Sequence, residues 1–242
     1  MLPLLLDFSG LQIFSYPLFI GLAWGLAFRL AEAELPSGIR PRSFIVWSLG
    51  LFLATWVGAK VFFIFTQDRW TTTELVEASN FWLGGGFVFL GGFIAGAIYT
   101  LIVGLVLPQF SHREMQFTLV PLLWGHAVGR IGCFLAGCCY GRETDLPWAI
   151  HLHGLDRHPV QLYEAVSLAA LAWILSHIKR TKLLPAYLLA YGGLRWCLEW
   201  FRGDELRGSL GGQSSSQWVS LFMVAIGLIL YVCKHLKSRN PA

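Results

Sequence analysis

Long apolar segments separated by short polar loops dominate the sequence. A membrane-spanning helix needs roughly 17–25 predominantly apolar residues. Seven segments satisfy this requirement, with approximate bounds 11–30, 44–66, 81–107, 117–138, 160–178, 184–201 and 216–233. The pattern therefore predicts an all-α, polytopic membrane protein with about seven transmembrane helices.

The composition supports an integral membrane protein. Hydrophobic residues make up 55% of the chain and charged residues 13%, and the mean hydropathy is +0.58, whereas soluble domains carry about 25% charged residues. The formal net charge of +4 is therefore no indication of a nucleic-acid partner. The segment Met1 to Phe8 lacks a basic region and a cleavage site, so the N-terminal apolar run is expected to be retained. Without internal repeats, residues 1–242 are predicted to form one transmembrane domain.

Basic residues are distributed unequally over the predicted loops. The loops after the first, third and fifth spans and the C-terminal tail are basic, whereas the alternate loops offset their arginines with acidic residues. Positive loops stay in the cytoplasm, so the C-terminus is predicted to be cytoplasmic and the N-terminus external. The basic loops and tail contain Arg40, Arg42, Arg113, Lys179, Arg180, Lys182, Lys234, Lys237 and Arg239.

The polar residues inside the predicted spans share the outer leaflet. The depth of each residue in the membrane follows from the helical rise of about 1.5 Å per residue and the predicted orientation. Ionisable groups inside a membrane are costly and indicate a functional site by default. We therefore predict one polar cavity open to the outer leaflet, containing Tyr16, Lys60, Arg130, Glu164, Arg195 and Glu199.

The sixth span carries a polar stripe at helical spacing. Its members fall on one face and are Tyr191, Arg195, Glu199 and Arg202. One interpretation is a purely structural Arg195–Glu199 pair, with Arg202 extending toward the interface. It leaves Arg130 unexplained, because no acid lies one turn away on its own helix. Two converging guanidinium groups favour an anionic ligand, and their planar geometry suits phosphate.

The fifth span begins with His158-Pro159, where proline is tolerated in the first turn. Gln161 and Glu164 then share a face, which indicates a ligand or an inter-helical network. His126 shares the Arg130 face of the fourth span and is interpreted as a structural histidine.

Three cysteines lie close together in the sequence, at positions 133, 138 and 139. They match no CxxC pattern, and adjacent cysteines do not easily bind one ion. We therefore expect apolar packing here, and neither a metal nor an organic cofactor.

Taken together, these segments resemble the prolipoprotein diacylglyceryl transferases, over nearly the whole chain. The resemblance rests on Ser15-Tyr16-Pro17, Gly58-Ala59-Lys60, Gly91-Gly92, Gly129-Arg130-Ile131-Gly132 to Gly141, His158 to Glu164, and Tyr191-Gly192 to Arg202. It implies a multi-pass enzyme of the bacterial plasma membrane that acts in lipoprotein maturation. Such an enzyme moves the diacylglyceryl group of phosphatidylglycerol onto the lipobox cysteine of a secreted precursor and releases glycerol phosphate.

The resemblance also implies roles for individual residues. Arg130 and Arg195 would hold the phosphate, with Tyr191, Glu199 and a base completing the catalytic groups. The expected substrate-binding residues are Tyr16, Lys60, Gly91, Gly92, Gln161, Glu164 and Arg202.

Three departures from the family pattern concern the acceptor side. Leu90 stands where the family has a histidine proposed as base, Lys60 where an arginine is usual, and Cys133 and Cys138 replace an asparagine and a glutamate. We predict that His158 replaces the missing base, or that the arginines activate the thiol directly. Two alternatives stay open: a transferase with another acceptor, and a non-catalytic lipid-binding or transport protein.

Overall fold

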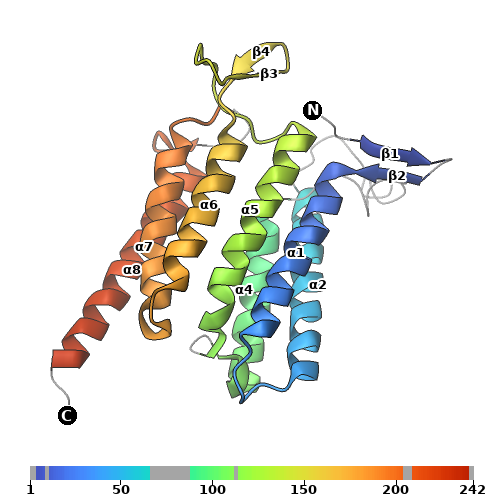
Figure 1. Cartoon of the computed structure of the whole chain (residues 1–242). Coiled ribbons are helices and arrows are strands. Elements are labelled where there is room, and N and C mark those ends of the chain that lie inside the picture. Colours follow the sequence, from blue (N-terminus) through green and yellow to red (C-terminus); the bar gives the residue numbers. More distant parts are fainter. Residues whose placement is uncertain (1–3, 9–10, 66–87, 112–113, 204–208, 240–242) are drawn as a thin grey trace. The chain divides into compact units, whose positions relative to one another are not determined.

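The computed structural model describes residues 4–8, 11–65, 88–111, 114–203 and 209–239, most of them helical (Figure 1). The helical fold that the apolar segments predict is confirmed. Within the described residues there are seven α-helices: α1 (Ser15–Ala33), α2 (Pro41–Phe65), α4 (Phe89–Val106), α5 (Leu119–Ala136), α6 (Val160–Ser176), α7 (Arg180–Glu199) and α8 (Ser215–Arg239). Two short 3-10 helices, η1 (Pro108–Phe110) and η2 (Glu114–Thr118), precede α5.

Three short antiparallel ribbons accompany the helices, so a purely α-helical fold was an incomplete prediction. They pair β1 (Leu4–Phe8) with β2 (Leu11–Phe14), β3 (Ile150–Leu152) with β4 (Leu155–Arg157), and β5 (Ser209–Leu210) with β6 (Gln213–Ser214). The first predicted span therefore begins as a strand, and its helix starts at Ser15. The turn of β3–β4 is His153-Gly154, and both residues have positive φ, which is the backbone geometry that two-residue hairpins favour.

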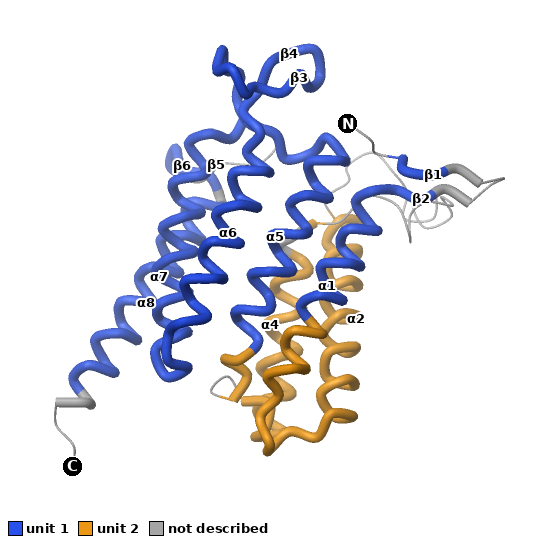
Figure 2. Tube along the Cα trace, viewed as in Figure 1, with its two compact units in different colours: residues 1–27, 118–242 blue, residues 28–117 orange. Residues whose placement is uncertain are grey.

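The chain divides into two compact units, residues 1–27 with 118–242 and residues 28–117 (Figure 2). Each has its own apolar core. In the first unit, Leu168 and Ala172 of α6 are fully buried among side chains of α5 and α7. In the second, Phe44 is buried in a cluster with Phe110 and Phe117. The single domain inferred from the sequence stays a prediction.

Small residues let helices of the first unit approach closely. α5 packs against α6, and α7 against α8. A Cβ atom added to Gly125 of α5 would lie 2.6 Å from the carbonyl oxygen of Ala23, and one added to Gly132 would lie 2.5 Å from Cβ of Phe19. The glycines are thus needed for contact between α1 and α5, as the small-residue pattern predicts. The segment of α5 between them carries Arg130.

The second unit is built on the close crossing of α2 and α4. A Cβ atom on Gly91 would lie 2.4 Å from the carbonyl oxygen of Gly58, and one on Gly92 would lie 2.9 Å from that of Thr55. The predicted third span starts at residue 81, but residues 81–87 lie outside the described part, as do residues 66–80 and 204–208 of the predicted loops. Leu90 is in the first turn of α4, and its side chain also lies outside that part.

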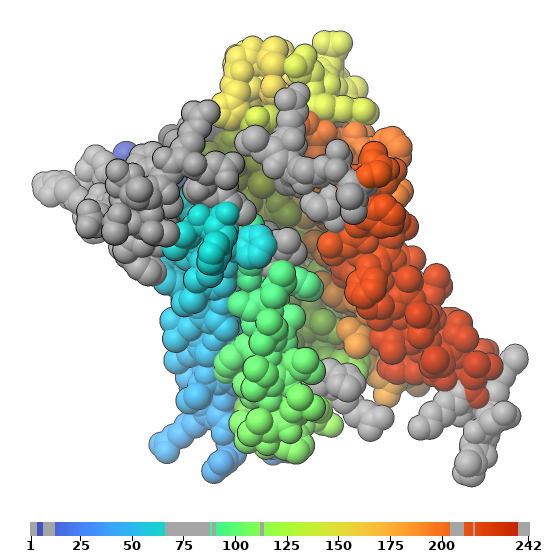
Figure 3. Space-filling model, turned by 180° about the vertical axis from the view of Figure 1, so that it is seen from behind, coloured from blue at the N-terminus to red at the C-terminus, as the bar shows by residue number. Residues whose placement is uncertain are grey.

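Large apolar side chains cover the outer faces of the helices. Leu105, Val166 and Phe222 are each about 70% exposed, a surface that soluble proteins rarely present. Figure 3 shows α2, α4 and α8 from behind the view of Figure 1. Among the described residues, three helical segments are long and apolar enough to cross a membrane: Pro41–Phe65, Glu114–Ala136 and Ser216–Leu236. The chain is therefore a membrane protein, and seven spans with an external N-terminus stay predictions.

Candidate active site

Backbone hydrogen bonds join the connection between α5 and α6 to the end of α7. Gly141 N–H donates to the carbonyl oxygen of His158 at 3.1 Å, and His158 N–H donates to that of Arg142 at 3.0 Å. Arg142 N–H donates in turn to the carbonyl oxygen of Phe201 at 2.9 Å. Three segments far apart in the sequence are thereby fixed side by side.

Two glycines make this close approach of the backbones possible. A Cβ atom on Gly141 would lie 2.5 Å from the carbonyl oxygen of His158, and one on Gly203 would lie 2.6 Å from the amide nitrogen of Arg142. Any larger residue at either position would push the segments apart. The glycines therefore bring the start of α6 and the end of α7 to the same end of α5.

Glu164 of α6 is the centre of the charged residues gathered there. Its side chain is fully buried, and Oε1 lies 2.8 Å from Nη2 of Arg130 and 3.8 Å from Nε2 of His126. Oε2 lies 4.0 Å from Nη1 of Arg202. A buried carboxylate needs such partners, because burying an isolated charge is very costly. Arg130 therefore has an acidic partner. The sequence showed no acid one turn away on its own helix, and the partner comes from a different helix, α6.

The second ion pair lies within α7. Nη2 of Arg195 is 2.7 Å from Oε2 of Glu199 and donates to Oγ of Ser216 in α8 at 2.8 Å. The pair that the spacing of the sixth span predicted is thus confirmed. Ser216 is itself held in the first turn of α8, where its carbonyl oxygen accepts a hydrogen bond from Oγ of Ser220.

Aromatic side chains connect the two ion pairs. The ring of Tyr191, one turn before Arg195, packs edge-on against the ring of His126 with centroids 5.8 Å apart. His126 faces Glu164 on its other side. We call Arg130, Glu164, Arg195, Glu199 and Arg202 the arginine–glutamate network. It contains three guanidinium groups and two carboxylates.

Both predicted phosphate-binding arginines carry a buried donor without a hydrogen-bond partner among the described residues. These donors are Nε of Arg130 and Nη1 of Arg195. Buried polar atoms nearly always have a partner, so an orphan donor indicates a water or a ligand. Orphan donors on both predicted phosphate-binding arginines suit an anion such as a phosphodiester.

Gln161 connects α6 to the segment that follows α5. Its Nε2 donates to the carbonyl oxygen of Cys138 at 2.7 Å, and the side chain is almost fully buried. The residue therefore supports the connection after α5, and its role in substrate binding stays a prediction. Tyr16 lies in the first turn of α1, within electrostatic range of Arg130.

His158 is enclosed by aromatic rings at the start of α6. Its Nδ1 lies 3.3 Å from the hydroxyl of Tyr163, and its ring packs edge-on against Phe201 with centroids 5.4 Å apart. Burial, together with the Arg142 guanidinium, lowers the pKa of His158 below its usual 6.5. The imidazole is thus neutral at pH 7 and able to accept a proton, and the role of base stays a prediction.

Three predicted binding residues belong to the second unit. Lys60 of α2 is almost fully buried, and Gly91 and Gly92 pack against α2 as described above. Helix packing accounts for both glycines, and a contact of any of the three with substrate stays a prediction.

Cys133, Cys138 and Cys139 are brought together by the end of α5 and the residues after it. Their sulfur atoms all lie within 4.8 Å of one another, and among the described residues they are the only such group able to hold a metal. We call these residues the cysteine cluster.

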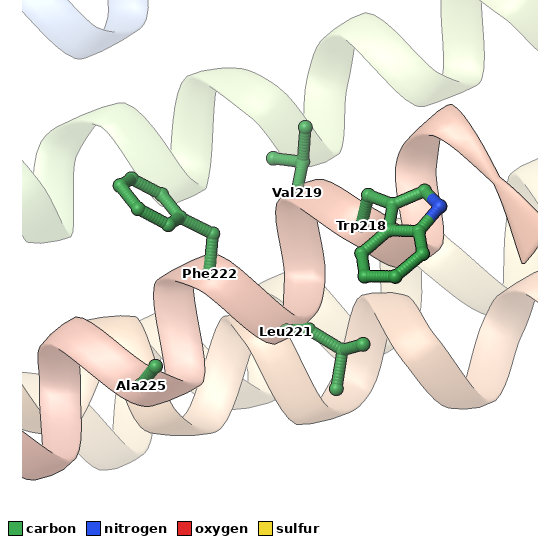
Figure 4. A pocket seen from close by; sticks show the side chains of 5 residues that line it. All are labelled: Trp218, Val219, Leu221, Phe222 and Ala225. Carbon is green, nitrogen blue, oxygen red and sulfur yellow. The ribbon is translucent and has the colours of Figure 1, made fainter. Parts of the chain in front are cut away.

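An open hollow of ≈ 530 Å³ lies on α8, and no charged residue lines it (Figure 4). The residues that line it are apolar or aromatic: Trp218, Val219, Leu221, Phe222 and Ala225. Such a surface suits acyl chains and holds no charged group. The polar site is therefore the arginine–glutamate network.

Two contacts of the site were not predicted from the sequence. His126 was placed on the Arg130 face and interpreted as structural, and its approach to Glu164 was not foreseen. Ser216 gave no signal, because its contact with Arg195 depends on how α8 packs against α7.

Comparison with known proteins gives a consistent result. A family model described as prolipoprotein diacylglyceryl transferase matches residues 3–233. The chain is 30% identical to phosphatidylglycerol–prolipoprotein diacylglyceryl transferase 2 of Clostridium perfringens, with 97% of this chain and 96% of the relative covered. Two other relatives are named phosphatidylglycerol–prolipoprotein diacylglyceryl transferase. The chain is 31% identical to that of Bordetella parapertussis, with 95% of this chain and 94% of the relative covered. It is 34% identical to that of Methylobacillus flagellatus, with 76% of this chain and 74% of the relative covered.

Proposed function

Since the chain belongs to the prolipoprotein diacylglyceryl transferase family, we propose that it transfers the diacylglyceryl group of phosphatidylglycerol to the lipobox cysteine of a secreted precursor. The observation that carries this proposal is the pair of buried, unpaired guanidinium donors on Arg130 and Arg195. Phosphatidylglycerol carries one negative charge on its phosphodiester, whose oxygens can accept hydrogen bonds from these donors.

The reaction is a displacement at a glycerol carbon. The cysteine sulfur attacks the carbon that carries the phosphate, a sulfur–carbon bond forms, and the carbon–oxygen bond breaks. Its electron pair stays on the departing glycerol phosphate. The phosphate changes from a singly charged diester to a monoester that carries a second charge, so charge develops where Arg130 and Arg195 lie. Preorganised donors at that place stabilise the transition state.

The carboxylates keep the guanidinium groups in position before the substrate arrives. Glu164 holds Arg130, and Glu199 and Ser216 hold Arg195. A donor fixed in this way loses little entropy when the phosphate binds. Tyr191, Arg202 and Tyr16 complete the surroundings of the phosphate in this proposal.

The acceptor thiol must lose a proton, because a thiol of pKa about 8.5 is only a few per cent ionised at neutral pH. His158 is the proposed acceptor of that proton, since its imidazole is neutral. Transfer is therefore measured in His158→Ala and, because Leu90 replaces the family histidine, in Leu90→His. Loss only in His158→Ala supports the base, whereas transfer that appears only in Leu90→His means that the natural acceptor is a different molecule.

The proposed location is the bacterial plasma membrane, with the site open to the outer leaflet where secreted precursors emerge. The basic loops of the sequence support this orientation. Both substrates, the phospholipid and the secreted precursor, lie in the same bilayer.

The proposal is tested by transfer of labelled diacylglycerol from phosphatidylglycerol to a lipobox peptide, with purified protein in detergent. A peptide with serine in place of cysteine is the control. Arg130→Gln and Arg195→Gln are expected to abolish transfer and weaken binding of phosphatidylglycerol, and Arg130→Lys to rescue poorly, because an ammonium group cannot form two parallel hydrogen bonds. Normal lipid binding by both glutamine variants would refute the phosphate site. Binding without transfer by the wild type would favour a non-catalytic lipid-binding protein.

A further inference from the structure

We propose that the cysteine cluster is a zinc site whose fourth coordination position takes the thiolate of the acceptor cysteine. The inference rests on the proposed function, because it assigns the cluster to the activation of that thiol. It differs from the sequence-based expectation of apolar packing without a metal.

The geometry of the cluster fits one ion. Zinc–sulfur bonds are about 2.3 Å, so sulfur atoms around a tetrahedral zinc are about 3.8 Å apart. The three sulfur atoms already lie within 4.8 Å of one another, and a shift of about 1 Å or less closes the site. Adjacent cysteines converge here because Cys139 has a left-handed backbone, with φ 59°. Few residues other than glycine adopt this conformation, and where they do it often marks a functional site.

The number of ligands favours a reactive site. Structural zinc sites have four protein ligands, whereas catalytic ones have three and leave one position open. The cluster offers three thiolates, and thiolates favour soft or borderline cations such as Zn²⁺. Cys138 and Cys139 are only partly buried, so a fourth ligand has access. A thiol that coordinates zinc is deprotonated outright.

The cluster lies beside the proposed phosphate site. Cys133 follows Arg130 by three residues on α5, so the two share a face and are about 4.5 Å apart along the helix axis. Gln161, one turn before Glu164 on α6, fixes the backbone of Cys138. A sulfur held by the cluster is thus close to a phospholipid whose phosphate is bound by Arg130.

The step balances without a redox partner. The acceptor thiol binds zinc and releases its proton to the neutral imidazole of His158, the proton acceptor proposed above. The bound sulfur attacks the glycerol carbon, and the carbon–oxygen bond breaks with its electron pair on the phosphate. The product is a neutral thioether, a weak ligand that leaves zinc at the same oxidation state. Full ionisation of a thiol that is about 3% thiolate at pH 7 raises the reactive fraction by up to about 30-fold.

The first measurement is metal binding by the purified full chain, kept reduced in detergent. Co²⁺ is the probe, because thiolate ligands give it charge-transfer bands and tetrahedral coordination gives intense visible bands. The proposal predicts one equivalent bound, displaced by Zn²⁺. Cys133→Ser, Cys138→Ser and Cys139→Ser should each abolish these bands, and the matched control Cys197→Ser/Cys233→Ser, at two exposed free cysteines, should keep them. Absence of stoichiometric binding, or binding that survives the cluster substitutions, overturns the site.

The second measurement asks whether the acceptor thiol binds the metal. A lipobox peptide with cysteine should shift the Co²⁺ bands, and the same peptide with serine should not. Equal spectra with both peptides would make the site structural and overturn the activating role. Chelation should reduce transfer by up to about 30-fold, with recovery on adding Zn²⁺. A thiol-dependent shift in a protein without any transfer would separate failure of the proposed function from failure of the metal site.

Discussion

Replacement of Glu164 by glutamine removes the carboxylate that holds the arginine–glutamate network together. The variant keeps nearly the same shape and loses only the charge. Unit charges 2.8 Å apart, the distance between Glu164 and Arg130, attract by about 6 kcal/mol at an effective dielectric constant of about 20. Most of this offsets the cost of burying the two groups. Removing one partner of a buried pair therefore leaves an uncompensated charge and costs about 3–5 kcal/mol.

The expected loss of about 3–5 kcal/mol is measured by unfolding in mixed micelles. Asp156→Asn is the matched control. Its carboxylate lies 2.9 Å from His151, but the Asp156 side chain is 65% exposed. An exposed pair is worth about 0–1 kcal/mol, so the control should unfold almost like the wild type. Equal stability of Glu164→Gln and the wild type would refute the buried network.

The same variant also tests the ligand. Without Glu164 the network loses one negative charge, so an anionic lipid should restore more stability to Glu164→Gln than to the wild type. Phosphatidylglycerol is compared with phosphatidylcholine, which carries no net charge, in thermal unfolding of both proteins. A midpoint that rises equally with the two lipids would mean that the guanidinium groups do not bind the phosphate.

Three further predictions follow from individual contacts. Gly141→Ala should destabilise the protein and abolish transfer, because its Cβ atom would lie 2.5 Å from a carbonyl oxygen. Gly25→Ala, inside α1 with nothing within 4 Å of its Cβ atom, should leave transfer unchanged and the stability equal or slightly higher. The pKa of His158 is lowered in the folded protein, so the unfolded state binds its proton first as the pH falls. The contribution of His158 to stability is therefore present above pH 6.5 and is lost as the pH falls through the lowered pKa. His158→Ala should flatten this part of the pH–stability curve. Reporter fusions at Arg180 should be cytoplasmic and those near Asp156 external, and the reverse result would place the site in the inner leaflet.

The sequence predicts contacts within one helix and misses contacts that depend on packing. Arg195 and Glu199 are four residues apart, so helical spacing alone places them side by side. Arg130 and Glu164 lie on different helices, and their 2.8 Å contact depends on how α5 meets α6. Both were placed in one cavity by depth, but the pairing was not foreseen. Depth along a helix is set by the sequence, whereas rotation about its axis is set by its neighbours.

The short ribbons and the cysteine cluster were missed for a related reason. The turn at His153-Gly154 needs positive φ at both residues, and an apolar segment pattern gives no sign of it. Cys139 has the same kind of backbone, so two consecutive side chains converge where an ordinary backbone would separate them. Dihedral angles of single residues decide these features, and hydrophobic periodicity does not report them.

The hydrogen bonds that join the connection after α5 to the end of α7 are made by backbone atoms. Side chains there can consequently change over evolution without loss of the join, provided that Gly141 and Gly203 remain. A relative could thus acquire a different external surface, suited to other precursor proteins, while the positions of Arg130 and Glu164 stay the same. Saturation mutagenesis of residues 140–142 and 201–203 would then show two intolerant glycines among neighbours that accept many substitutions, with Arg202 excepted because its guanidinium faces Glu164.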